Sequence, residues 1–107
     1  MENLQDYWNS IPIGYENRKT YSELCEEWGM SRRYVRHVLH RLSEVDNGDG
    51  LILIRSAYST GFYRTDDPSE IERYRREVIS RASNTFSMLK KINRVMGEDE
   101  SQLRIEL

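Results

Sequence analysis

With 107 residues the chain can form one compact domain but not two, and its apolar fraction of 37% limits it to a small hydrophobic core. No stretch approaches the roughly 18 consecutive apolar residues of a membrane span, and the acidic N-terminus lacks the apolar run of a signal peptide. The net charge of −2 is too small to keep the chain unfolded and the single cysteine excludes an internal disulfide, so we expect a soluble cytoplasmic protein.

Local capping and breaking signals divide the chain into short elements. Thr20 and Glu23 form a capping box at the start of a helix, and Gly29 fits the left-handed residue that ends it. Asp67, Pro68 and Glu70 fit the N-cap, first and third positions of a helix, which predicts another helix start. In chain order, the sequence predicts helices over 3–10 and 21–28, a helix from Ser31, strands over 51–54 and 61–64, and a helix from Pro68 to about Met96. The predicted fold class is mainly α, with a small antiparallel β-hairpin and a long C-terminal helix.

The segment from residue 21 to residue 42 has the spacing of a helix-turn-helix. Two helices joined by a short turn cross steeply, which requires a small side chain at their contact, and Cys25 supplies it. Gly29 follows four positions later in the turn, and Val35 and Val38 come next on the inner face of the second helix. An ordinary helical hairpin is the alternative.

The second of these helices carries a concentrated positive charge. Residues 31–45 contain four arginines against one acid, Glu44, together with both histidines of the chain. Seven long polar side chains share the outer face of this helix: Arg32, Arg33, Tyr34, Arg36, His37, His40 and Arg41. Recognition helices enter the DNA major groove by their N-terminal end, where arginine can donate two hydrogen bonds to guanine. A basic face that is merely solvated is the alternative.

The position of each side chain along this helix predicts its role. The predicted base contacts lie toward the N-terminal end: Arg33, Tyr34 and His37. The predicted phosphate contacts are the remaining outward residues: Arg36, His40 and Arg41. Arg32 lies nearer the core, so we expect it to reach either a phosphate or the preceding helix.

Residues that could support catalysis or hold a metal are sparse. His37 and His40 are spaced i, i+3, but two histidines and one cysteine are too few for most zinc sites. No acid or histidine is placed to activate Cys25, and the chain has no glycine-rich phosphate loop, defined carboxylate pair or Ser-His-Asp order. We therefore predict no enzymatic activity, no catalytic residues, no cofactor and no metal.

The predicted strand, loop and strand after the second helix add to the pattern. The stretches YSELCEEWGMSRRYVRHVLHRLSE and LILIRSAYSTGFYRTDDPSEI resemble the winged helix-turn-helix of the biotin-repressor type. Ser31, Arg32 and Val35 match that family's S-R-x-x-V recognition-helix motif, and Gly61 with Phe62 matches the start of its second strand. The resemblance covers about residues 20–68 and implies a winged helix-turn-helix domain over residues 1–67.

The hairpin of such domains is called the wing. In the family the wing contacts the DNA minor groove or backbone, and the matching tip residues are Arg55, Tyr58, Ser59 and Thr60. Because this wing has only one arginine near its tip, it can equally serve as a protein contact. The chain is also similar to small winged-helix proteins of phages and prophages of Gram-positive bacteria, which share an IP-x-G-x-E-N segment and a basic C-terminal helix. That similarity implies the cytoplasm of a bacterial or phage-infected host cell.

The predicted C-terminal helix, residues 68–97, is long for so small a domain. Its apolar residues recur at three- and four-residue steps and form one stripe: Ile71, Tyr74, Val78, Ala82, Phe86, Leu89, Ile92 and Met96. The helix either breaks at 80–85, where weak helix formers gather, or pairs with a second copy. We predict a homodimer through five residues: Ala82, Phe86, Leu89, Ile92 and Met96. We expect the acidic tail, residues 98–107, to be disordered and outside this interface.

Two functions of different classes remain. The predicted function is sequence-specific binding of double-stranded DNA, by a phage, prophage or bacterial transcription regulator or a replication accessory. The alternative is a winged-helix module that binds a protein partner and has weak or no affinity for DNA. The arginine-rich helix favours the first, whereas the isoelectric point near 5.7 and the weakly basic wing favour the second. Neither prediction involves a membrane or a small-molecule substrate.

Overall fold

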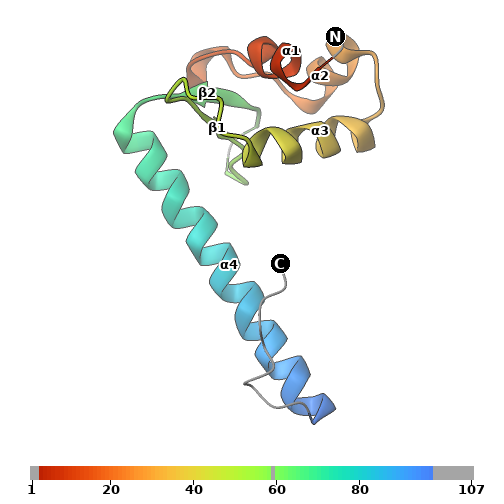
Figure 1. The fold of residues 1–107 in the computed structure, drawn as a ribbon, viewed down its shortest axis with the longest axis vertical. Coiled ribbons are helices and arrows are strands. Elements are labelled where there is room, and N and C mark those ends of the chain that lie inside the picture. The colour runs from red at the N-terminus through yellow and green to blue at the C-terminus, as the bar shows by residue number, and fades with distance from the viewer. Residues whose placement is uncertain (1–2, 59, 98–107) are drawn as a thin grey trace. The chain divides into compact units, whose positions relative to one another are not determined.

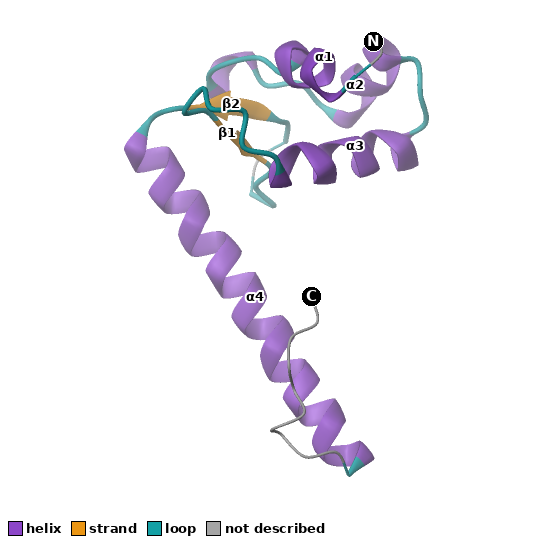
Figure 2. Cartoon of the chain, viewed as in Figure 1, coloured by secondary structure: helices purple, strands orange, loops and turns teal. Residues whose placement is uncertain are grey.

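The structure is a computed structural model that describes residues 3–58 and 60–97. The elements in chain order are α1 (Leu4–Ser10), η1 (Tyr15–Asn17), α2 (Tyr21–Trp28), α3 (Arg32–Glu44), β1 (Ile52–Ile54), β2 (Tyr63–Thr65) and α4 (Pro68–Met96) (Figure 1). The fold is mainly helical with a two-stranded antiparallel sheet and a long C-terminal helix, as predicted (Figure 2). None of the helices in the described residues is long and apolar enough to cross a lipid bilayer.

The chain divides into two compact units, and the boundary falls inside α4. The first unit ends at Tyr74 and the second begins at Arg75. The domain boundary predicted from the sequence lies earlier, at residue 67, because the capping signals visible in the sequence mark the start of the helix there. α4 is a single helix from Pro68 to Met96, so the break considered at 80–85 does not occur. The predicted acidic tail, 98–107, lies outside the described residues.

The capping signals act as the sequence predicts. The Thr20 hydroxyl accepts a hydrogen bond from the Glu23 N–H at 3.2 Å, and the Glu23 carboxylate accepts one from the Thr20 N–H at 3.2 Å. Gly29 ends α2 with φ at 64°, the left-handed conformation that favours glycine. Ser31 then caps α3 by accepting from the Tyr34 N–H. Three residues therefore separate the two helices, as a helix-turn-helix requires.

The core of the first unit draws on α1, α2, α3 and β1, and on Ile11 and Phe62, which lie next to α1 and β2. Its buried cluster comprises Trp8, Ile11, Leu24, Trp28, Val35, Leu39, Leu42, Leu53 and Phe62. Cys25 and Val38 are half-buried against this cluster, on the faces where α2 and α3 were predicted to meet. The amphipathic spacing of α1, α2 and α3 is thus sufficient to build a small core without any large apolar run.

The strands differ from their predicted bounds by one or two residues at three of their four ends. β1 pairs with β2 so that Ile52 lies opposite Thr65 and Ile54 lies opposite Tyr63. The second strand was predicted over 61–64, but Phe62 pairs instead with Lys19, through hydrogen bonds of 2.7 and 3.0 Å. Gly61 allows this pairing, because a Cβ there would lie 2.9 Å from the Lys19 carbonyl oxygen. The segment before α2 therefore pairs with the hairpin at β2, in addition to the pairing of β2 with β1. The sequence did not predict this second pairing.

A buried arginine, Arg64, lies where this segment meets β2. It is 9% exposed, and its Nε donates to the Ile11 carbonyl at 2.7 Å. Its guanidinium lies 5.5 Å from the centre of the Trp8 ring, whose indole N–H donates to Asp49 at 2.7 Å. Burial lowers the pKa of Arg64 and the nearby Asp49 carboxylate raises it.

Asp49 gives the fold a testable acid dependence. Hydrogen bonds from the Leu51 N–H and the Trp8 indole hold the pKa of this carboxyl below its ordinary 3.8. Because the folded-state pKa is depressed, the carboxylate stabilises the fold above its ordinary pKa, and this contribution is lost as the pH falls through the folded value. In urea unfolding, Asp49→Asn should therefore be less stable than the wild type at pH 7, with a smaller difference near pH 3. A difference that is the same at both pH values would contradict this account.

Candidate nucleic-acid interface

α3 exposes the whole set of side chains that the sequence predicted for its outer face. The exposed residues are Arg32, Arg33, Tyr34, Arg36, His37, His40 and Arg41. On the opposite side, Val35, Leu39 and Leu42 are no more than 2% exposed and fix the helix to the core. Because the helix is held by its apolar face, its rotation is set and the basic face points to solvent.

At the N-terminal end of α3, two arginines gather around one tyrosine. The Arg32 guanidinium lies 4.3 Å from the centre of the Tyr21 ring, and that of Arg36 lies 5.8 Å from it. The ring itself packs edge-to-face on Phe62, with centroids 4.8 Å apart. A guanidinium stacked on a ring keeps its N–H groups in its own plane, where they can still donate to a phosphate. Arg32 thus contacts the preceding helix, one of its two expected positions.

The C-terminal end of α3 is less suited to an anion. His40 Nε2 lies 3.0 Å from a carboxylate oxygen of Glu44, so this acid competes with any phosphate for the imidazole. The Arg55 side chain lies at the same end of α3, where its Nη1 donates to the Ser43 hydroxyl at 3.3 Å. Its Nε is buried and has no hydrogen-bond partner among the described residues. Arg55, predicted at the wing tip, is therefore half-buried against α3.

In the loop between β1 and β2, the predicted wing, Tyr58 is 91% exposed and Thr60 is also exposed. Ser59, the third predicted tip residue, lies outside the described residues. The Thr60 hydroxyl accepts from Arg18 Nε at 3.3 Å, and the Arg18 guanidinium lies 4.0 Å from the centre of the Tyr15 ring. Arg18 thus supplies the wing with a cation that the sequence analysis missed, because the two residues are 42 positions apart in the chain.

The surface of α2 has the opposite sign. Glu23, Glu26 and Glu27 are exposed on this helix, and Glu27 forms an ion pair with Lys19. That pairing, with a further bond from Lys19 to the Ser10 carbonyl, commits the lysine to the fold. Phosphates would be repelled by α2 and attracted by α3, so a polyanion is directed to the basic helix.

The potential metal ligands of the described residues do not gather in one place. Among residues 3–58 and 60–97, no three His, Cys, Asp or Glu side chains lie together in a way that could hold a metal ion. Cys25 carries a free thiol that is half-buried against the core. No protein-family model, no curated protein and no solved structure matches the chain. The chemistry of the α3 surface is therefore the basis on which function can be argued.

The Tyr21 ring provides a direct test of how this surface is organised. Tyr21→Leu removes the stacking surface for Arg32 and the edge-to-face contact with Phe62, so it should destabilise the first unit by about 1 to 2 kcal/mol. Tyr21→Phe keeps the ring and should remain within about 0.5 kcal/mol of the wild type. Urea unfolding followed by tryptophan fluorescence measures both. Equal losses for the two variants would mean that the hydroxyl, not the ring, matters.

Proposed function

We propose that the chain is a winged helix-turn-helix protein that binds double-stranded DNA sequence-specifically, with α3 in the major groove. The observation that carries the proposal is the outer face of α3, which exposes four arginines and two histidines while its inner face is fixed in the core. The major groove is wide enough to admit one α-helix, and arginine is the side chain that most often reads guanine there.

The order of residues around α3 supports distinct roles for them. At about 100° per residue, Arg33 and His37 lie one above the other at the centre of the outer face. Arg36 lies on one flank of that line and Arg41 on the other, which suits contacts to the phosphates on the two sides of a groove. Base reading is assigned to Arg33 and His37, together with Tyr34, which lies near the N-terminal end of α3 that enters the groove. Backbone positioning is assigned to Arg36, His40 and Arg41, with Arg32 in a supporting position.

The resemblance to small winged-helix proteins of Gram-positive phages and prophages extends the proposal. It favours a transcription regulator or replication accessory in the cytoplasm of a bacterial or phage-infected cell. The second candidate, a protein-binding module, is favoured by the wing, where Tyr58 is 91% exposed. Tyrosine is enriched at protein interfaces because its ring buries a large area at a small cost in side-chain entropy.

Selection of duplexes from a random library, followed by fluorescence anisotropy on the selected site, tests the proposal. The wild type should bind more weakly as salt rises, with log K falling by about 0.9 per phosphate contacted for each unit of log salt. Arg33→Ala should cost about 1 to 3 kcal/mol of binding and relax the preference at one base pair. Arg36→Ala should weaken all duplexes alike and reduce the salt slope by about 1.

A control double variant distinguishes binding through α3 from a general effect of positive charge. Lys91→Ala with Arg94→Ala removes two positive charges from α4, one more than either α3 variant removes, and should leave the selected site and its affinity unchanged. Arg33→Ala should keep the free energy of unfolding within about 0.5 kcal/mol, because the side chain is exposed. If the wild type selects no duplex at about 50 mM salt, the protein-binding alternative replaces DNA binding.

A further inference from the structure

The distal part of α4 leaves a large apolar surface in water. Seven of its apolar side chains are between 40% and 81% exposed: Val78, Ile79, Met88, Leu89, Ile92, Val95 and Met96. Together they leave on the order of 600 Å² of apolar surface exposed, at or above the largest patch of a typical monomer. Soluble proteins cover patches of this size with a partner, so the identity of the partner becomes the question.

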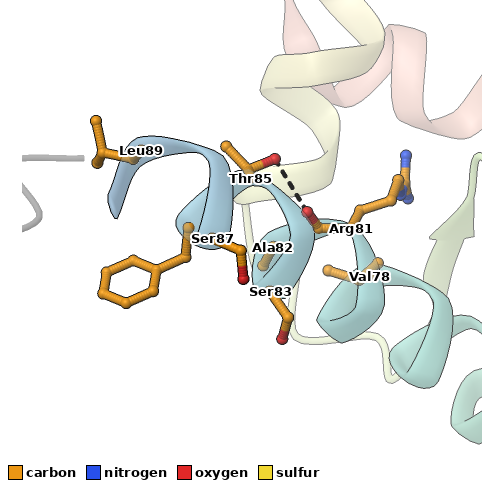
Figure 3. Close-up of a pocket in the computed structure, with 8 residues that line it drawn as sticks. Val78, Arg81, Ala82, Ser83, Thr85, Ser87 and Leu89 are labelled. Atoms are coloured by element: carbon orange, nitrogen blue, oxygen red, sulfur yellow. Dashed lines mark hydrogen bonds between the residues drawn. The ribbon is translucent and has the colours of Figure 1, made fainter. Parts of the chain in front are cut away.

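The sequence of this surface has the spacing of a helix–helix seam. Val78, Ala82, Thr85, Leu89, Ile92 and Met96 alternate at four- and three-residue steps, which is the pattern of core positions in a coiled coil. Two small residues, Ala82 and Thr85, interrupt the larger ones and line an open hollow beside Phe86 (Figure 3). The Thr85 hydroxyl donates to the Arg81 carbonyl at 3.0 Å, so it needs no partner across an interface.

We infer that a second copy of the chain occupies this face and that the two helices run antiparallel. In the antiparallel register that we propose, Ala82 of one copy lies opposite Ile92 of the other, and Thr85 lies opposite Leu89. Val78 and Met96 form the outer layers in the same way. Each small residue thus meets a large one, whereas a parallel pair would place Ala82 against Ala82 and leave a void in that layer. The two small residues, which lie in the N-terminal half of the seam, therefore select the antiparallel arrangement.

The buried area is compatible with a stable dimer. If each copy contributes on the order of 600 Å², the pair buries about 1,200 Å², the lower end of specific protein interfaces. A lipid surface is the competing occupant for a basic amphipathic helix, but such helices place bulky Trp, Phe or Leu at the centre of the apolar face. Here Ala82 and Thr85 lie on the apolar face itself, and their small side chains favour the close approach of another helix.

The oligomeric state of the full chain, measured without nucleic acid, tests the inference independently of DNA binding. Sedimentation equilibrium at 1–100 μM should give twice the chain mass of 12.8 kDa. Leu89→Glu with Ile92→Glu should raise the dissociation constant at least about 100-fold, because two charges enter the seam of each helix. Ser80→Glu with Ser87→Glu adds the same charge to the polar face and should remain dimeric. Circular dichroism checks that both double variants keep their helices.

Cysteine cross-linking in a Cys25→Ala background tests the register directly. A mixture of Thr85→Cys and Leu89→Cys chains should form a disulfide between the two variants under mild oxidation, and each variant alone should cross-link much more slowly. Rapid cross-linking of Thr85→Cys to itself would overturn the antiparallel register. A wild-type mass of 12.8 kDa at 100 μM would overturn the dimer, as would a monomer that binds phosphatidylglycerol vesicles.

Discussion

A single buried charge organises the first unit. Arg64 donates through its side chain to the Ile11 carbonyl, and its backbone N–H donates to the Pro12 carbonyl at 2.7 Å. Its carbonyl accepts from the Gly14 N–H at 3.0 Å, while Leu53 is its partner in the sheet. A guanidinium in this position must find acceptors or lose the free energy of its hydration. The Ile11 carbonyl, in the chain before α2, supplies one acceptor, and the two backbone bonds of Arg64 to Pro12 and Gly14 hold this segment against β2.

The basic surface depends on this arrangement although Arg64 takes no part in it. The pairing of residues 12–19 with β2 brings Arg18 to Thr60 in the wing. The same pairing sets the start of α2, so that the Tyr21 ring can pack on Phe62 and receive Arg32. Both arginines are thus positioned by a segment of the first unit for which the sequence predicted no regular structure.

Features that depend on contacts between residues close in the chain could be predicted from the sequence, whereas features that depend on contacts between distant residues could not. Helix starts at Thr20, Ser31 and Asp67 were predicted because each cap is formed with residues two to four positions away in the chain. The outer face of α3 was predicted because helical periodicity determines which side is apolar. The burial of Arg64 and the ring contacts of Tyr21 could not be predicted, since they join residues whose separation in the chain carries no local signal. For the same reason the resemblance placed Arg55 at the wing tip, whereas the structure places its side chain beside Ser43.

The placement of the two tryptophans has a consequence for spectroscopy. Trp8 donates to Asp49 and Trp28 donates to the Ser10 hydroxyl at 2.8 Å, both within the first unit. α4 contains no tryptophan, yet with 29 residues it contributes about half of the helix in the described chain. Indole emission therefore reports the folding of the first unit alone, whereas ellipticity at 222 nm weights both units. Comparing the two signals in one titration measures how far the units unfold together, without any label.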